Sequence, residues 1–294
     1  MAWDMAVVSA FVRAARKPTY TDAARFRAHL EAPKPDGAPP LRLRRRHRVQ
    51  IREIDGFRCV TVTPRGGAAD GPVVLYLHGG AYVSPIARQH WALISRLAGA
   101  GAAVHVPLYG RAPQHTYRET YRLLDAVYAD LAPHADRLTV MGDSAGGGLA
   151  LGLAQVLRDT GRQMPRALTL IAPWVDVTCS NPGIAAIAPH DPWLSTVGAT
   201  IAGQAWAGGD DLTDPRLSPV FGSMAGLPPI DLYYGDRDIT FADADLIARP
   251  ARAAGVAVDL TVAPGACHVY PLTPTRVGRR DRARIVARAT APAG

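Results

Sequence analysis

Hydrophobic positions repeat along this chain with two different periods, and the period changes near residue 45. Residues 3–16 and 20–31 have the three-to-four-residue spacing of amphipathic helices, and Pro18 lies between them. A proline- and glycine-rich stretch at 33–40 then predicts a loop. After this loop, short β-branched runs replace the helical period, so we expect two helices before the main body of the fold.

Eight short runs rich in β-branched residues predict strands. They lie at residues 47–53, 57–63, 73–78, 102–107, 137–141, 167–171, 230–234 and 257–262. From residue 73 onward, helical patterns separate them, at residues 87–99, 116–130, 145–158, 241–254 and 276–289. This alternation predicts an α/β protein whose mostly parallel sheet has helices on both faces, with an antiparallel hairpin formed by the first two strands. A segment at about 180–225, with a predicted helix at 195–207, interrupts the alternation.

The composition indicates a large hydrophobic core, and the charge is distributed unevenly along the chain. The chain has 294 residues, of which 48% are hydrophobic, enough for a sizeable core. Its formal net charge of +8 is concentrated in two arginine-rich segments, 42–52 and 276–288, and the rest of the chain is slightly acidic. There is no basic helix with interleaved aromatic residues, the pattern typical of nucleic-acid binding. We therefore expect no nucleic-acid partner and interpret both segments as solvated or ion-paired surface.

Several common binding motifs are absent from the sequence. Neither lysine follows a glycine, so there is no Walker A loop, and Cys59, Cys179 and Cys267 lack the spacing of zinc ligands. We therefore expect no metal and no organic cofactor. The basic residues near the start follow the apolar stretch instead of preceding it, and no run of roughly 18 apolar residues is present. These features predict a cytoplasmic protein without stable membrane insertion.

The strongest chemical signal is the sequence Gly-Asp-Ser-Ala-Gly at residues 142–146, between a predicted strand and an apolar helix. Gly-x-Ser-x-Gly in this context is typical of a nucleophilic serine, here Ser144, on a sharp strand-to-helix turn. The alternative is a glycine-rich helix start that binds an anion. The glycines do not form the Gly-x-Gly-x-x-Gly of a dinucleotide site, so we favour the nucleophile.

A nucleophilic serine needs an oxyanion hole, a base and an acid that orients the base. Strand 73–78 runs into the sequence His-Gly-Gly-Ala-Tyr, and its turn could direct amides at a bound oxyanion together with the amide after the serine. The candidate donors are Gly79, Gly80, Ala81 and Ala145. The acid and then the histidine should follow the serine along the chain. His268, just after the last strand, has no rival histidine downstream of His190.

Four aspartates are candidates for the acid. Asp236 and Asp238 follow the strand at 230–234, near the carboxyl ends where catalytic groups gather in such sheets. Asp243 and Asp245 fall inside the following predicted helix, and Asp236 fits an ordinary turn residue. The residues favour Asp238 but leave the other three open.

Four segments together resemble the hormone-sensitive-lipase-like branch of the α/β-hydrolases, which includes the bacterial family IV carboxylesterases. They are His-Gly-Gly-Ala-Tyr at 78–82, Gly-Asp-Ser-Ala-Gly-Gly at 142–147, Gly-Asp-Arg-Asp-Ile-Thr-Phe-Ala-Asp at 235–243, and His-Val-Tyr-Pro at 268–271. The resemblance implies an α/β-hydrolase fold with a mostly parallel eight-stranded sheet and a helical cap. Residues 1–45 would form the N-terminal cap segment and 46–294 the catalytic domain, with 180–225 contributing to the cap.

The same resemblance implies a function and a set of site residues. It favours Asp238 through the Gly-x-x-Asp spacing of the family and so implies a triad of Ser144, Asp238 and His268. The expected activity is hydrolysis of short- to medium-chain carboxylic esters of small molecules through an acyl-enzyme. An amidase, a lactonase or a deacetylase could use the same triad. A non-catalytic hydrolase-like receptor is disfavoured because His268 is present.

Two departures from the family pattern affect the surroundings of the triad. Ala81 stands where the family usually has a third glycine, and residues 108–114 read Leu-Tyr-Gly-Arg-Ala-Pro-Gln in place of Asp-Tyr-Arg-Leu-Ala-Pro-Glu. The first leaves an amide in place, and the second changes local ion pairs and cap packing. Candidate walls of the acyl pocket are Tyr82, Trp193 and Trp206. Relatives in this branch often form dimers through an edge strand, so a homodimer stays open.

Overall fold

One eight-stranded sheet organises the computed structural model, which describes residues 3–66 and 70–292. The strand order is β1-β2-β4-β3-β5-β6-β7-β8. β1 and β2 pair antiparallel, as do β2 and β4, and the remaining pairs are parallel. The strands are β1 (Arg48–Ile54), β2 (Phe57–Thr63), β3 (Val73–Leu77), β4 (Ala103–Pro107), β5 (Leu138–Asp143), β6 (Ala167–Ile171), β7 (Ile230–Gly235) and β8 (Val258–Ala263). This arrangement confirms the predicted fold class.

The hairpin predicted at one edge of the sheet is formed by β1 and β2. Ile54 lies opposite Phe57, so the turn contains two residues, Asp55 and Gly56. Both have positive φ, 48° and 78°. A turn with positive φ at both central residues follows the twist of the strands that it joins.

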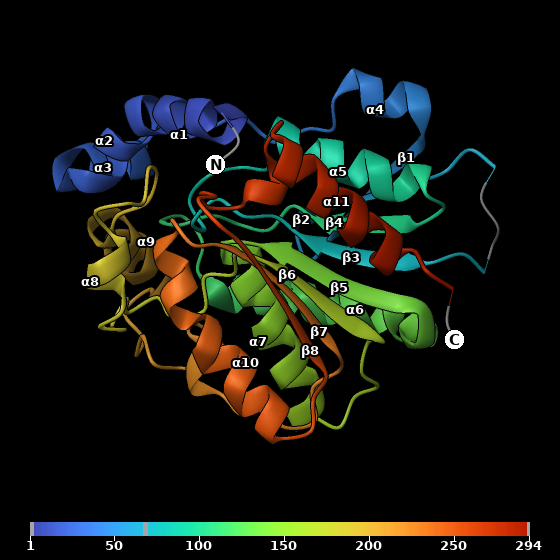
Figure 1. Ribbon diagram of the computed structural model, residues 1–294. Helices are drawn as coiled ribbons and strands as arrows, with labels where there is room; N and C mark the ends of the chain where they lie inside the picture. Colours follow the sequence, from blue (N-terminus) through green and yellow to red (C-terminus); the bar gives the residue numbers. More distant parts are fainter. Residues whose placement is uncertain (1–2, 67–69, 293–294) are drawn as a thin grey trace.

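Helices cover both faces of the sheet (Figure 1). α5 (Arg88–Gly99) and α11 (Arg276–Ala289) lie on one face, and α6 (Tyr117–Leu131), α7 (Ala145–Asp159) and α10 (Ala244–Ala253) lie on the other. The chain reverses direction across the sheet after β4, and right-handed crossovers therefore place α6, α7 and α10 on the face opposite α5. Ligands bind where such a reversal occurs, at the carboxyl ends of the strands. Within the described ranges, no helix combines the length and apolarity needed to cross a bilayer.

Helices distant in sequence meet beyond these carboxyl ends, at the left of Figure 1. They are α1 (Trp3–Ala15), α2 (Lys17–Thr21), α3 (Ala23–Glu31), α8 (Ile184–Ile187) and α9 (Thr196–Ala207). Both α2 and α3 pack against α9. The packing is close, because a Cβ on Gly198 of α9 would lie 2.7 Å from the ring of Phe26 in α3. The N-terminal helices and the segment at 180–225 therefore enclose the same end of the sheet.

The N-terminal region has more helices than the two that the sequence predicts. Pro18 does not separate two helices: it lies in the first turn of α2, where a missing N–H costs nothing. A further helix, α4 (Leu41–Arg46), forms in the first arginine-rich segment. Only Leu43 of α4 is buried, at 3% exposure, and one apolar position gives no period that sequence analysis could detect.

Candidate active site

Ser144 lies at the sharp turn between β5 and α7. Its backbone has φ 52° and ψ −123°, a conformation that a residue with a side chain adopts only at an energetic cost. A Cβ on Gly142 would lie 2.1 Å from the carbonyl oxygen of Gly146, and one on Gly146 would lie 2.0 Å from that of Leu77. Close packing therefore explains both glycines of the motif, and the turn presents the serine at the strand ends.

Ser144, His268 and Asp238 lie in one chain of hydrogen bonds, although three different strands position them. His268 follows β8, and its Nε2 lies 2.8 Å from Ser144 Oγ. Its Nδ1 lies 2.7 Å from Oδ2 of Asp238, which follows β7. Asp238 is fully buried, and its Oδ1 accepts hydrogen bonds from the amide and hydroxyl of Thr240. The carboxylate is therefore fixed from two sides and orients the imidazole.

Opposing effects determine the pKa of His268. Burial lowers it, because a charged imidazolium loses its hydration. The negative charges of Asp238, Asp191 and Asp143 act in the opposite direction and outweigh burial, so that the pKa of His268 is raised above its usual value. The histidine can thus accept a proton from Ser144 and retain it during a reaction step.

The other three aspartates that sequence analysis left open have other partners. Asp236 Oδ1 accepts the amide of Gly265 at 2.6 Å and closes the turn after β7. Asp245 is exposed and pairs with an arginine of its own helix. Asp243 accepts a hydrogen bond from Asn181 at 2.8 Å, and burial raises its pKa to about 7. Asp238 is the carboxylate that contacts the imidazole.

The loop after β3 supplies amides beside Ser144, but the prediction for Gly79 needs a correction. The Gly79 amide donates to Asp143 Oδ1 at 3.1 Å, so it is not free to bind an oxyanion. Gly80 and Ala81 follow with φ of 128° and 54° and line the cavity in front of the serine. Ala145 begins α7, where the amides of the first turn have no partner within the helix. Gly80, Ala81 and Ala145 therefore remain as candidate donors.

Asp143 holds this loop against the serine turn, a role that sequence analysis missed. Its Oδ1 also accepts the hydroxyl of Tyr76 at 2.5 Å, and its Oδ2 lies 3.2 Å from Nε2 of His90. Burial opposes ionisation of Asp143, but His90 and the hydrogen bonds outweigh it, and the pKa is lowered. Asp143 occupies the variable second position of the motif, so its spacing carries no signal of this role.

Asp191 is a second functional candidate that the sequence does not reveal. It lies between α8 and α9 and is fully buried. Its Oδ1 accepts the amides of Trp193 and Leu194, and its Oδ2 accepts the amide of Ile239 at 2.9 Å. Ile239 directly follows Asp238, so Asp191 connects the 180–225 segment to the acid of the triad.

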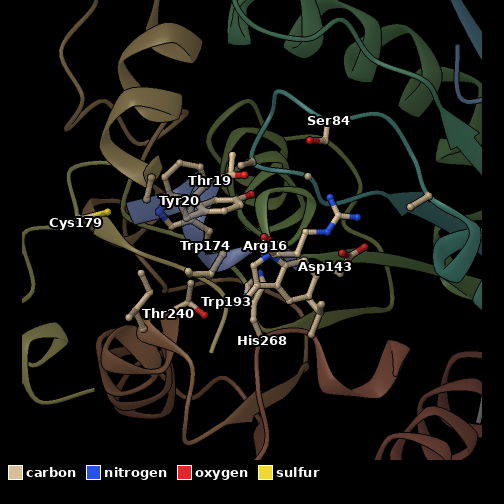
Figure 2. Close-up of a pocket in the computed structure, with 18 of the residues that line it drawn as sticks. Arg16, Thr19, Tyr20, Ser84, Asp143, Trp174, Cys179, Trp193, Thr240 and His268 are labelled. Carbon is tan, nitrogen blue, oxygen red and sulfur yellow. Dashed lines mark hydrogen bonds between the residues drawn. The ribbon is translucent and has the colours of Figure 1, made fainter. Parts of the chain in front are cut away.

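A cavity of about 150 Å³ opens in front of Ser144 and His268. Its apolar lining includes Tyr20, Trp174 and Ile184, and its polar lining includes Arg16 and Ser84. Figure 2 shows Tyr20 and Cys179 on one side of the view and Ser84 and Asp143 on the other, with His268 and Trp193 between them. The cavity is therefore contributed jointly by the N-terminal helices, the 180–225 segment and the sheet.

Of the three aromatic residues predicted as pocket walls, Trp193 lines the cavity and meets the His268 ring edge to face at 5.8 Å. Tyr82 and Trp206 are placed differently from the prediction. Their rings stack at 4.4 Å, at 1% and 0% exposure, in the core behind the cavity surface. Two large aromatic rings interact more favourably when they stack on each other in the core than when they line an open cavity.

Comparison with known proteins agrees with this geometry. A family model described as the α/β-hydrolase fold matches residues 74–272. A Mycobacterium tuberculosis protein named as a candidate acetyl-hydrolase, LipR, is 37% identical, covering 76% of this chain and 74% of its own. An acetyl-hydrolase of Streptomyces hygroscopicus is 33% identical, covering 72% of each chain. A crystal structure of an esterase from the bacterial hormone-sensitive lipase family superposes with a TM-score of 0.81 at 27% identity, covering 100% of this chain and 99% of the other.

Proposed function

We propose a mechanism from the premise that the chain belongs to the α/β-hydrolase family, in its hormone-sensitive-lipase-like branch, and is a carboxylic ester hydrolase. The observation that carries the mechanism is the hydrogen-bonded chain Ser144–His268–Asp238. This arrangement pairs a nucleophile with a base and the base with an orienting acid, as acyl transfer requires.

In the proposed reaction, Ser144 Oγ attacks the ester carbonyl carbon while His268 Nε2 accepts its proton. The carbonyl oxygen becomes an oxyanion, which the amides of Gly80, Ala81 and Ala145 stabilise. The C–O bond to the alcohol then breaks, and His268 gives its proton to the departing oxygen. Water, deprotonated by His268, attacks the acyl-enzyme in the same way and releases the acid. Asp238 stabilises the imidazolium in each step.

The size of the cavity supports small esters as substrates. Pockets for drug-sized ligands measure about 300–1,000 Å³, whereas this cavity measures about 150 Å³. We propose short acyl chains, with medium chains reaching toward the mouth. A series of 4-nitrophenyl esters of increasing chain length should give a kcat/KM that falls once the acyl chain exceeds the cavity.

Further proposals concern the cap over the active site, the cellular location and the oligomeric state. We propose that α1 to α3 and the 180–225 segment act as a cap, supported by their contributions to the lining through Tyr20 and Ala199. A cytoplasmic location and a homodimer also remain proposals, to be tested by cell fractionation and by light scattering.

The decisive test is Ser144→Ala, with Ser223→Ala as a matched control on an exposed serine. Removing the nucleophile should lower kcat on 4-nitrophenyl acetate by at least about 10³-fold and leave a folded protein. Ser223→Ala should retain activity. Equal turnover by wild type and Ser144→Ala would contradict the proposed mechanism.

A further inference from the structure

Arg16 presents a guanidinium to the cavity, and the proposed mechanism does not use it. The residue lies between α1 and α2 and lines the cavity together with Ser144 and His268. Figure 2 shows its side chain directed toward the side of Ser84 and Asp143, away from Cys179. A solvent-exposed cation therefore lines the cavity in which the substrate binds.

The charge of Arg16 is not neutralised by the parts of the chain that the structure describes. No carboxylate there lies within ion-pairing distance of its guanidinium, and the residue is exposed. The two lysines of the same region differ, because their ammonium groups are engaged. Lys17 donates to the carbonyl of Leu194, and Lys34 donates to the carbonyl of His29 at 2.6 Å. Arg16 is thus available to a ligand.

On this side of the cavity, the positive charge comes from Arg16. His29 also lines the cavity, and its Nε2 lies 3.2 Å from Ser84 Oγ. Burial lowers the pKa of His29, and the positive charges of Lys34 and Arg16 lower it further. His29 is therefore neutral at neutral pH and offers a hydrogen bond without a competing charge.

The cavity lining also includes buried carboxylates. Asp176 and Asp243 line it and are both 2% exposed. Asp176 is engaged by the amides and hydroxyls of Thr178 and Ser180. Asp143 also lines the cavity, but Tyr76 and His90 engage its carboxylate. Arg16 is therefore the lining group that attracts an anion, while the unneutralised charge of the carboxylates repels it.

We propose that the substrate is an ester that carries a second, anionic group of the carboxylate type, bound by Arg16 while the ester carbonyl lies at Ser144. A planar guanidinium binds a carboxylate through two parallel N–H donors, which fixes its orientation as well as its position. Arg16 is then a specificity-determining residue. This inference rests on the proposed ester hydrolysis and adds the class of substrate.

The test compares charged and neutral esters of similar shape in wild type, Arg16→Gln and Arg13→Gln. Arg13 is a matched control: it is exposed, lies one turn earlier on α1 and does not line the cavity. For an anion on the acyl side, the pair is 4-nitrophenyl hydrogen glutarate and 4-nitrophenyl pentanoate. For an anion on the alcohol side, the pair is 3-acetoxybenzoate and phenyl acetate. The readout is the charged-to-neutral ratio of kcat/KM, which cancels any general loss of active protein.

For one of the two pairs, Arg16→Gln should lower this ratio by roughly tenfold, mainly through KM, because a charge-assisted hydrogen bond is lost. High salt should lower the ratio of the wild type in the same direction, and Arg13→Gln should keep it. An unchanged ratio in Arg16→Gln for both pairs overturns the inference, as does an equal fall in Arg13→Gln. If wild type hydrolyses the neutral esters through Ser144 but Arg16→Gln leaves the ratio unchanged for both pairs, the inference fails alone. If Ser144→Ala hydrolyses them equally well, the proposed mechanism fails.

Discussion

The carboxylate of Asp191 belongs to the segment between α8 and α9, yet it bonds to the turn that holds Asp238. Burial and the nearby charge of Asp238 raise the pKa of Asp191 to about 6. Its negative charge in turn raises the pKa of His268. Asp191 therefore acts on His268 through its charge and, through the Ile239 amide, on the position of Asp238.

A pH profile measures this influence. Only neutral His268 accepts the serine proton, so kcat/KM should rise with pH through the raised pKa of the histidine. Asp191→Asn removes one of the negative charges that raise this pKa, and the acidic limb of the profile should shift to lower pH. Asp245→Asn, on an exposed residue of α10, should leave the limb in place. A limb that stays in place in Asp191→Asn would show that its charge does not reach the imidazole.

Sequence analysis finds site residues where one local pattern requires them. Ser144 is identified by the small neighbours that its turn needs, and His268 by chain order after the last strand. Gly79 was predicted wrongly as an oxyanion donor, because its amide is taken by a residue 64 positions later, Asp143. Asp191 was missed for a similar reason: the amide that it holds near the triad lies 48 positions away, at Ile239. Such contacts leave no periodic trace in the sequence.

At the scale of elements, the contact between α9 and the N-terminal helices shapes the cavity. Gly198 of α9 faces both helices, and a Cβ there would lie 2.7 Å from the ring of Phe26 and 2.9 Å from that of Tyr20. Tyr20 itself lines the cavity. The missing side chain at one position thus sets how closely α2 and α3 approach the active site.

Gly198→Val should therefore force the N-terminal helices away from α9. Overpacking of this kind costs about 1–3 kcal/mol, and the displaced Tyr20 should lower kcat/KM on short esters by roughly tenfold. Limited proteolysis within residues 3–31 should accelerate in parallel. Gly66→Val is the control, because a Cβ there meets no atom of the described residues within 4 Å. Unchanged kinetics and proteolysis in Gly198→Val would mean that the two elements do not depend on close contact.

The elements themselves were predictable to different degrees. Strands of the sheet are recognised because they are short runs rich in β-branched residues, and their alternation with helices indicates a mostly parallel sheet. Short helices are not recognised: α4 has six residues with one buried side chain, and α8 has four. Their formation depends on tertiary packing, which a short local pattern does not encode.

At the scale of the whole molecule, the two arginine-rich segments contribute differently to the net charge. In α11, Arg284 and Arg288 both pair with Asp259 of β8, and Arg288 also pairs with Asp231 of β7. These pairs join the last helix to the last two strands of the sheet. In α4, by contrast, Arg45 has no ion pair within the part of the chain that the structure describes. The last helix is thus tied to the sheet by several ion pairs, whereas in the first segment Arg52 of β1 pairs with Asp130 of α6 and Arg45 of α4 lies on the surface.

Arg288→Ala and Arg45→Ala distinguish these two kinds of charge. The Asp231 side chain is only 12% exposed, and burial raises its pKa, so losing Arg288 leaves a poorly hydrated carboxylate. We expect the free energy of unfolding at neutral pH to fall by about 1–2 kcal/mol in Arg288→Ala and by less than about 0.5 kcal/mol in Arg45→Ala.

An acid whose folded pKa is raised binds more protons in the folded state, so acidification favours folding through Asp231. The penalty of Arg288→Ala should therefore shrink at acidic pH, and urea unfolding at two pH values measures it. Equal penalties in the two variants would show that the pairs of α11 contribute no more to stability than free surface charge.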